Sequence, residues 1–446
     1  MVQIKLTGFF MTMSLKITYN QCLDAMYALR RFGIKLDLDV IGGILKGLGD
    51  PQDRLDFVHI AGTNGKGSIA ASLAAILVKA GYRVGLFTSP HLVRFNERIR
   101  VNGRQISNDH LVDAYMAVNQ ACQGKREATF FEITTAMALY EFLREKVDLA
   151  VIETGMGGRL DATNIIRPLV TIISNISIEH RQYLGNTLME IAAEKAGIIK
   201  TNIPVVTGVR QNKAITVIER TAGERSAPCY RLGQAFRIRR CKNDRFNYYG
   251  LDHVWRKLST SLAGDQQPEN AALAISACEL LNRQQMTITE AHVRNGLKNV
   301  DWPARLDVIS TDPYILLDGA HNLAAARKLA RFISAKLSNR SITLVIGILD
   351  DKPYRAMLAL LAPLANRVIV TRASIDRALP PKTLAKKARI YSRNIVIQPD
   401  VAGAVRYAVT TIGKKDAIVV AGSLYVVGEA MAYLNNDRPP DPGESA

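Results

Sequence analysis

The residues with the clearest chemical purpose form the run Ala61-Gly62-Thr63-Asn64-Gly65-Lys66-Gly67-Ser68. Glycines let backbone N–H groups turn inward around a chain of phosphates, and a helix that begins there adds its dipole. The run departs from the GxxxxGK[ST] pattern, because Ile60 stands at the first glycine position and Gly67 follows the lysine. Residues 63–68, with Lys66 reaching the outer phosphates, are therefore predicted to bind a nucleotide.

A carboxylate is expected beside this loop. Glu153 ends the apolar segment DLAVIE (148–153), and the side chains at the carboxyl ends of parallel strands share one edge of a sheet. A hard cation such as Mg²⁺, which accompanies nucleotide phosphates, needs oxygen ligands of this kind. The alternative is a strand-end glutamate that caps a turn.

A second group of polar residues follows a later apolar strand in LLDGAHN (316–322). Asp318 and His321 come just after the strand, where side chains serve a site at its carboxyl end. The ordinary alternative for Asp318 is a helix cap.

The elements that must position these residues alternate along the chain. Strands are predicted at 57–61, 82–88, 148–153 and 169–174, with a helix at 68–80. Such alternation predicts a mainly parallel sheet that is covered by helices on both faces. Residues 222–262 are more polar and suggest a small antiparallel excursion, after which helices return at 268–282 and 288–298.

A second, shorter α/β series follows a predicted hinge at 299–304. Its helix is expected at 322–334, and its strands are expected at 307–310, 314–318, 343–349, 367–371, 394–398 and 417–423. The predicted domains are therefore 1–298 and 305–436, and the tail 437–446 is expected to be disordered.

Length and composition agree with two soluble domains. The chain has 446 residues, more than one ordinary core accommodates, and 48% of them are hydrophobic. No stretch approaches about 18 consecutive apolar residues, so no transmembrane helix is expected. The start is a poor signal peptide, with Met11 or Met13 as an alternative first residue. Five cysteines without CxxC spacing suit a reducing compartment, so the predicted location is cytoplasmic.

The chain is strongly basic, with 58 Lys and Arg against 40 Asp and Glu and a formal net charge of +18. This charge suits nucleic acids, but it also suits ATP and small polycarboxylates. The densest basic cluster partly alternates with apolar residues, which is typical of the solvated face of a strand; it comprises Arg237, Arg239, Arg240, Lys242 and Arg245. No basic run carries interleaved aromatics, so we expect small-molecule substrates and no nucleic-acid or membrane partner.

Taken together, the motifs resemble the folylpolyglutamate synthase and dihydrofolate synthase family of the muramyl-ligase superfamily. GTNGKGS is the variant loop that marks the superfamily, whose members make amide bonds through an acyl phosphate. The other matching segments occur in the family's order; they are 30–36, 88–103, 129–139, 153–164, 179–200, 267–275, 302–309, 316–322 and 421–430. The resemblance covers almost the whole chain. It implies an N-terminal P-loop ATPase domain with a mainly parallel sheet and a smaller C-terminal Rossmann-like α/β domain.

The resemblance also implies roles for single residues. Ser89 and His180 would join Glu153 as ligands of one or two magnesium ions, although a lone histidine before a polar loop is usually a surface residue. ATP contacts are implied for Asn270, Arg305 and Asp318, with a helix cap as the alternative for Asn270 and a surface salt bridge for Arg305. His321 would lie between the nucleotide and the amino acid. The residues expected to border the pterin are Thr129, Phe130, Phe131, Glu132, Leu160, Asp161 and Ala162, and Ser423 is expected to hold glutamate.

Lys195 lies on a helix with an apolar face, where an ordinary lysine would extend into solvent. The resemblance implies instead that it is carbamylated and so becomes an anion that supports magnesium. Three positions depart from the family pattern, and the changes at Leu323 and Gln266 remove no catalytic group. Glu179 stands where Asp is common, Leu323 where Pro is common and Gln266 where His is common; the last is the one placed to alter nucleotide contacts.

The predicted function is ATP-dependent formation of an amide bond between L-glutamate and dihydropteroate, a folate or both, with Lys66, Lys195 and His321 as catalytic residues. Resemblance to members that catalyse both reactions favours a bifunctional monomer, with a folate-only enzyme next. A muramyl-peptide ligase is disfavoured, because about sixty residues before the loop leave little room for a uridine-nucleotide domain. A nucleotide-gated binding protein without ligase activity would be expected to lack metal ligands or Lys195.

Overall fold

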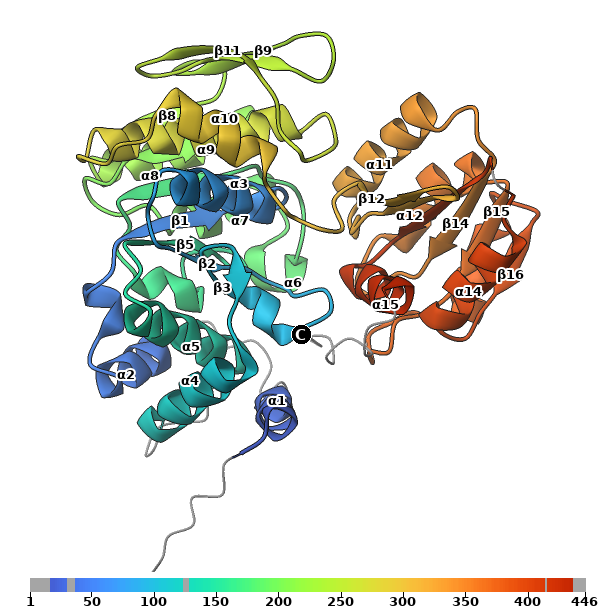
Figure 1. Cartoon of the computed structure of the whole chain (residues 1–446), viewed down its shortest axis with the longest axis horizontal. Coiled ribbons are helices and arrows are strands. Elements are labelled where there is room, and N and C mark those ends of the chain that lie inside the picture. The colour runs from blue at the N-terminus through green and yellow to red at the C-terminus, as the bar shows by residue number, and fades with distance from the viewer. Residues whose placement is uncertain (1–16, 30–36, 123–127, 414, 436–446) are drawn as a thin grey trace, which may run out of the picture.

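The structure is a computed structural model that describes residues 17–29, 37–122, 128–413 and 415–435. The predicted segment 30–36, the start of the chain and the tail 437–446 lie outside these residues. An eight-stranded sheet forms before the linker 299–304, and a six-stranded sheet forms after it (Figure 1). The predicted fold class, a large mainly parallel sheet with a smaller C-terminal α/β domain, is confirmed.

The large sheet has the order β4-β3-β2-β5-β1-β6-β7-β8, in which only β3 and β4 are antiparallel to their neighbours. Its central strands are fully buried and mainly apolar, as is typical of parallel strands covered on both faces. The bounds are β1 Phe57–Ala61, β2 Val84–Phe87, β3 Ile99–Val101, β4 Arg104–Gln105, β5 Leu149–Glu153, β6 Val170–Ile173, β7 Val205–Thr207 and β8 Cys229–Arg231.

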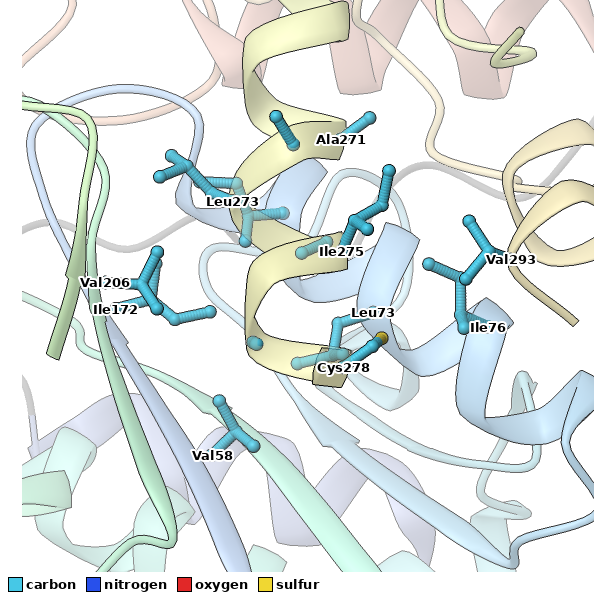
Figure 2. Packing of buried hydrophobic residues seen from close by; sticks show 14 of the residues in the cluster. Val58, Leu73, Ile76, Ile172, Val206, Ala271, Leu273, Ile275, Cys278 and Val293 are labelled. Carbon is cyan, nitrogen blue, oxygen red and sulfur yellow. The ribbon is translucent and has the colours of Figure 1, made fainter. Parts of the chain in front are cut away.

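Helices cover both faces of this sheet because alternate residues of each strand point to opposite sides. On one face, Val58 and Ile172 of the strands lie against Leu73 of α3 and Leu273 of α9 (Figure 2). The helices of this layer are α3 Lys66–Lys79, α9 Gln267–Asn282 and α10 Glu290–Lys298. The other face carries α1 Tyr19–Ala28, α2 Asp39–Gly47, α4 Asn108–Ala121, α5 Phe130–Arg144, α7 Leu188–Ala196 and α8 Asn212–Glu224.

The predicted antiparallel excursion is present, although its first strand, β8, joins the large sheet. A separate three-stranded sheet follows, in the order β11-β10-β9, and lies beyond α9 and α10 (Figure 1). Its strands are β9 Arg237–Arg240, β10 Phe246–Tyr249 and β11 Val254–Leu258. The basic cluster is the exposed side of β9 and of the turn after it, while Ile238 packs against the core, so the predicted solvated strand face is confirmed.

The second sheet has the order β12-β13-β17-β14-β15-β16, with only β12 antiparallel. Its strands are β12 Asp307–Thr311, β13 Tyr314–Leu317, β14 Ile342–Ile346, β15 Arg367–Val370, β16 Ile395–Ile397 and β17 Ala417–Ala421. One face packs on α11 Leu323–Lys336, α12 Tyr354–Leu361 and α13 Pro381–Ala388, and the other packs on α14 Val401–Thr411 and α15 Leu424–Leu434.

One local expectation was wrong in detail. The helix after the phosphate loop begins at Lys66 rather than Ser68, because Gly65 takes a left-handed conformation that ends the loop two residues earlier. The segment 88–103, one of the segments that carry the family resemblance, contains a 3₁₀ turn at Phe95–Arg98 and strand β3. Within the described residues, no helix combines the length and apolar composition needed to cross a bilayer.

Candidate active site

The phosphate loop connects β1 to α3 and has glycine where a side chain would collide. Gly65 has φ +88°, and a Cβ added there would lie 2.8 Å from Asn270 Oδ1. A Cβ added to Gly67 would lie 2.5 Å from the ring of Trp302, so the linker between the two sheets lies directly on the start of α3. The glycine after the lysine, a departure from the commoner pattern, therefore makes room for the linker.

Lys66 and Glu153 come together at the carboxyl edge of the large sheet, as predicted. Lys66 Nζ donates to Gly62 O over 3.0 Å and lies 3.9 Å from Glu153 Oε1. Glu153 is buried, and its other oxygen accepts the N–H of Ser89 over 3.4 Å. Burial raises the pKa of Glu153, while the Lys66 charge opposes the rise. A cation bound here would stabilise the carboxylate form.

His180 is at the start of the short helix α6, Arg181–Leu184, in a left-handed conformation with φ 44°. The residue is exposed overall, but the protein packed around its ring lowers its pKa to about 4, against the attraction of Glu179. Its imidazole is therefore neutral at neutral pH, which is the form that ligates metals. Ser89, Glu153 and His180 all line one cavity, where the hydroxyl and carboxylate oxygens suit magnesium and the neutral imidazole adds one nitrogen donor.

Lys195 does not extend into solvent, in contrast to an ordinary lysine on an apolar helix. Its side chain is buried, and Nζ donates to Gly62 O over 3.0 Å and to Glu179 Oε1 over 2.7 Å. Burial lowers the pKa of Lys195, while Glu179 opposes that effect. Burial alone would raise the pKa of Glu179, but Lys195 and Lys66 outweigh it and lower the value to about 2. Both lysines thus meet at the carbonyl of Gly62.

Arg305 lies between two residues with left-handed backbone, Ala304 at φ 60° and Leu306 at φ 51°. Such a conformation is unfavourable for residues other than glycine, so the turn needs external support. Asp318 Oδ2 accepts the N–H of Leu306 over 2.9 Å, and Gly319 N donates to Ala304 O over 2.8 Å. Asp318 therefore holds the turn that carries Arg305.

The helix-cap alternatives for the two predicted nucleotide contacts do not hold. Helix α11 is capped by Asn322, whose side chain accepts the N–H of Ala325, and not by Asp318. Asn270 lies in the first turn of α9, inside the helix, and donates to Gln267 Oε1 over 2.9 Å.

His321 comes shortly after strand β13 and is partly buried. Its Nδ1 lies 2.9 Å from Gly319 O, and because a carbonyl only accepts, Nδ1 carries the proton. Burial lowers the pKa of His321 to about 4, although the Gly319 carbonyl opposes this. The ring is therefore neutral at neutral pH, with Nε2 as an acceptor.

Two of the residues predicted to border the pterin are N-caps, Thr129 of helix α5 and Asp161 of a 3₁₀ turn. Thr129 begins α5, and Glu132 Oε2 accepts the N–H and the hydroxyl of Thr129 over 2.7 and 2.8 Å. Asp161 begins the 3₁₀ turn Ala162–Ile165 and accepts the N–H of Met156 over 2.8 Å. These polar groups are largely satisfied within the protein, so they shape the wall next to the aromatic rings of Phe130 and Phe131.

Two adjoining cavities collect the predicted residues. The first is lined by Thr63, Asn64, Gly65, Lys66, Gly67, Ser89, Thr129, Phe130, Phe131, Glu132, Glu153, Leu160, Asp161, Ala162, His180, Arg305, His321 and Ser423. The second is lined by Asn64, Gly65, Ser68, Asn270, Arg305 and Asp318, among others. Lys195 lines neither and reaches the first only through Glu179 and the Gly62 carbonyl. Residues from both sheets thus face one continuous space.

Several residues at these cavities were missed from the sequence. Lys352 and Arg377 of the second domain line the first cavity, and Asn175 lines the second. Asn322 Nδ2 donates to Asn64 Oδ1 over 2.9 Å and so joins the second domain to the phosphate loop. The DDK run at 350–352 before a helix was the available signal for Lys352; nothing local marks Arg377.

Comparison with known proteins places the chain among amide-forming ligases. Residues 60–278 match the Mur ligase middle domain, and residues 304–424 match the Mur ligase glutamate ligase domain. The dihydrofolate synthase/folylpolyglutamate synthase of Bacillus subtilis is 36% identical over 429 residues, which cover 93% of this chain and 99% of that protein. The dihydrofolate synthetase of Saccharomyces cerevisiae is 33% identical over 90% of this chain and 99% of its own length.

Solved structures of similar proteins align with nearly the whole length of this chain. E. coli FolC in complex with DHPP and ADP aligns with a TM-score of 0.87 and 28% identity, covering 94% of this chain and 98% of that one. Mycobacterium tuberculosis folylpolyglutamate synthase complexed with ADP aligns with a TM-score of 0.87 and 31% identity, covering 94% of this chain and 100% of that one.

Proposed function

This chain belongs to the dihydrofolate synthase/folylpolyglutamate synthase group of the Mur ligase family, and we propose that its cavity joins L-glutamate both to dihydropteroate and to folates. It is an ATP-dependent ligase, as that family is. The observation that carries the proposal is a single cavity in which Lys66 and Glu153 of the first domain face Arg305 and His321 of the second. The aromatic wall of Phe130 and Phe131 borders the same space and suits a flat pterin.

The proposed reaction has two steps. A carboxylate oxygen of the pterin substrate attacks the γ-phosphorus of ATP, the bond to ADP breaks, and an acyl phosphate forms. The amine of glutamate then attacks the acyl carbon and loses a proton, and phosphate departs with the electron pair of the C–O bond. Lys66, Arg305 and the amides of the phosphate loop neutralise the charge that develops on the transferring phosphoryl group.

We assign magnesium to Ser89, Glu153 and His180, where it would neutralise phosphoryl oxygens when bound. Carbamylation of Lys195 is proposed because its buried amine has a lowered pKa, and the neutral amine is the form that adds CO₂. In the present structure the Lys195 ammonium pairs with the Glu179 carboxylate, whereas a Lys195 carbamate would place a second anion beside that carboxylate. That arrangement requires a cation close by, which Lys66 and a bound magnesium ion would supply.

His321 is proposed to orient the glutamate amine rather than to hold its proton. With a pKa of about 4, the ring is too weak a base to keep a proton taken from an amine at neutral pH. Its Nε2 is nevertheless fixed as an acceptor by the contact of Nδ1 with Gly319 O. An acceptor at this place aligns an N–H of the incoming amine.

The carboxylates of glutamate are assigned to the second-domain wall. Lys352 and Arg377 line the first cavity there with Ser423. Asp351 ties the two cations together, lying 2.6 Å from Lys352 Nζ and 3.9 Å from Arg377. A pair of cations matches a dicarboxylic amino acid.

We further propose a monomeric, cytoplasmic enzyme that needs no macromolecular partner. One chain supplies both walls of the cavity, so a second copy is not needed to complete it. All five cysteines are free thiols, which suits a reducing compartment.

The test is phosphate release by the purified protein with ATP and L-glutamate, comparing dihydropteroate, tetrahydrofolate and a muramyl nucleotide as acceptors. We expect release with both pterins, a product extended by one glutamyl residue, and none with the muramyl nucleotide. Release with the muramyl nucleotide alone, or with no acceptor, would overturn the assignment.

A further inference from the structure

We propose that Lys328, on helix α11, is a nucleotide-binding residue that supplies a cation to the phosphate nearest the ribose of ATP. This inference rests on the proposed function in taking ATP as the ligand, and it adds a residue that neither the phosphate loop nor the motifs contain. In the sequence, Lys328 is an unremarkable lysine on an amphipathic helix. Its significance comes only from the cavity that the two domains form together.

The second cavity continues the first toward the base end of a nucleotide. The two cavities share Asn64, Gly65 and Arg305, so a phosphate chain that begins at Lys66 passes over these residues into the second cavity. Side-chain amides and apolar groups line that space, as a purine nucleoside requires; they are Asn175, Gln266, Gln267, Asn270, Leu306, Ala325 and Leu329. Lys328 is on the same wall, one turn after Ala325 on α11.

Among the described residues, no carboxylate lies within ion-pair distance of the Lys328 ammonium, although Glu269 and Asp318 act on it from further away. The residue is half-buried and makes no hydrogen bond or ion pair with another residue in the described part of the chain. Both oxygens of Asp318 accept backbone N–H groups, from Leu306 over 2.9 Å and from Ala320 over 3.0 Å. Glu269 is paired with Arg210 at 2.9 Å.

The balance of charge around Lys328 is therefore positive. Arg305 is a second cation on the same wall, and Asp318 is the one carboxylate among the described residues that line the cavity. Burial lowers the pKa of Lys328, and Arg305 and Arg331 lower it further, against Glu269 and Asp318. The start of α3 adds the positive end of its dipole at Ser68. An anion completes this site, and the phosphate nearest the ribose is the anionic group of ATP that falls at this end.

The position of Lys328 also depends on the contact between the domains. Asn322, which begins α11, donates to Asn64 Oδ1 over 2.9 Å. Helix α11 is thereby held against the phosphate loop, and Lys328 follows six residues, or about 1.7 turns, after Asn322. A bound phosphate would then contact the loop and α11 at once.

The experiment compares Lys328→Met, Lys328→Gln and Lys328→Arg with the matched control Lys336→Met, an exposed lysine at the end of the same helix. ADP binding is measured by calorimetry, and the steady-state constants are measured for each substrate. We expect about tenfold weaker ADP binding and an equal rise in KM for ATP in the Met and Gln variants. We expect kcat within about twofold of wild type, unchanged KM for glutamate and the folate, and recovery in Lys328→Arg.

Inhibition by AMP and by adenosine identifies the group that is contacted. In the Met variant, inhibition by AMP should weaken as ADP binding does, whereas adenosine should inhibit wild type and variant equally. Unchanged ADP binding in a folded Met or Gln variant, an equal loss with adenosine, or an equal loss in Lys336→Met would each overturn the inference. ADP binding is measured without turnover, so it can be compared between wild type and variants even if the wild-type protein does not ligate glutamate. In that case the proposed function would be refuted, but weaker ADP binding by the Lys328 variants would still support this inference.

Discussion

Lys66 bears the largest share of the proposed phosphate chemistry at the scale of single residues. Its ammonium is held by the Gly62 carbonyl and is partly open to the cavity, so it contributes little to the core. Lys66→Ala should lower kcat by about a thousandfold or more, because a fixed cation at the transferring phosphoryl group is lost. Thermal unfolding should change little. Lys79→Ala, at the exposed end of the same helix, is the control; near-normal turnover by folded Lys66→Ala would refute the phosphate assignment.

Lys195 gives a second prediction. Lys195→Ala should lose activity, and short-chain carboxylic acids should restore part of it by placing a carboxylate where the carbamate stood. The same acids should not rescue Lys66→Ala, which lacks a cation rather than an anion. Mass spectrometry of the native protein should find the carbamate. A bare ammonium, together with full activity of Lys195→Ala, would contradict the proposal.

Among the elements, β1 carries a pH-sensitive residue far from solvent. His59 is fully buried, its Nε2 lies 2.8 Å from Thr163 Oγ1, and burial, with a smaller effect of Lys200, lowers its pKa to about 3. The folded state therefore keeps His59 neutral, while the unfolded chain takes up a proton below pH 6.5. Stability should fall as pH falls from 6.5 toward 3, by about 1.4 kcal/mol per pH unit from this residue.

The measurement is the free energy of unfolding between pH 7 and pH 4.5 for wild type and for His59→Gln. The variant is expected to be less stable at pH 7 and to depend less steeply on pH. An identical slope in both proteins would show that His59 is not the group that titrates.

The elements differ in how far the sequence could predict them. Strands β1 and β5 are mainly apolar, with His59 the one polar residue of β1 and Glu153 the last residue of β5, so both their place and the carboxylate that ends β5 could be predicted. Strand β4 has two exposed residues at the edge of the sheet, where polar residues are tolerated. Strand β3 beside it has only three residues, and no periodicity marks either strand. Among single residues, the sequence marks Glu179 only as a departure from the family pattern, although it is the ion-pair partner of Lys195.

Local sequence patterns could not predict the cavity residues that come together only through the contact between the two domains. Arg377 and Lys328 belong to a loop and to an amphipathic helix whose sequences are unexceptional, and both reach the cavities because the second domain lies against the first. The left-handed turn around Arg305 depends likewise on Asp318, thirteen residues later in the chain. Tertiary contacts of this kind have no signature in the spacing of nearby residues.

For the whole molecule, the central prediction is that one cavity serves two acceptors. Dihydropteroate presents a benzoyl carboxylate, and a folate presents a γ-carboxylate several ångströms further out, so the pterin must take two placements before one phosphoryl centre. This gene alone should restore growth of a strain that lacks dihydrofolate synthase, because the protein should supply that missing activity. Failure to grow, with folate extension intact in vitro, would leave the polyglutamylating activity only.

The most direct test of an acyl-phosphate ligation follows a carboxylate oxygen into the released phosphate. A folate whose γ-carboxylate carries ¹⁸O is incubated with the wild-type protein, ATP and L-glutamate, and the released phosphate is analysed by mass. Formation of an acyl phosphate predicts that each phosphate carries one oxygen from the carboxylate, with label in step with amide formation. Phosphate without label, released while the amide forms, would contradict formation of an acyl phosphate.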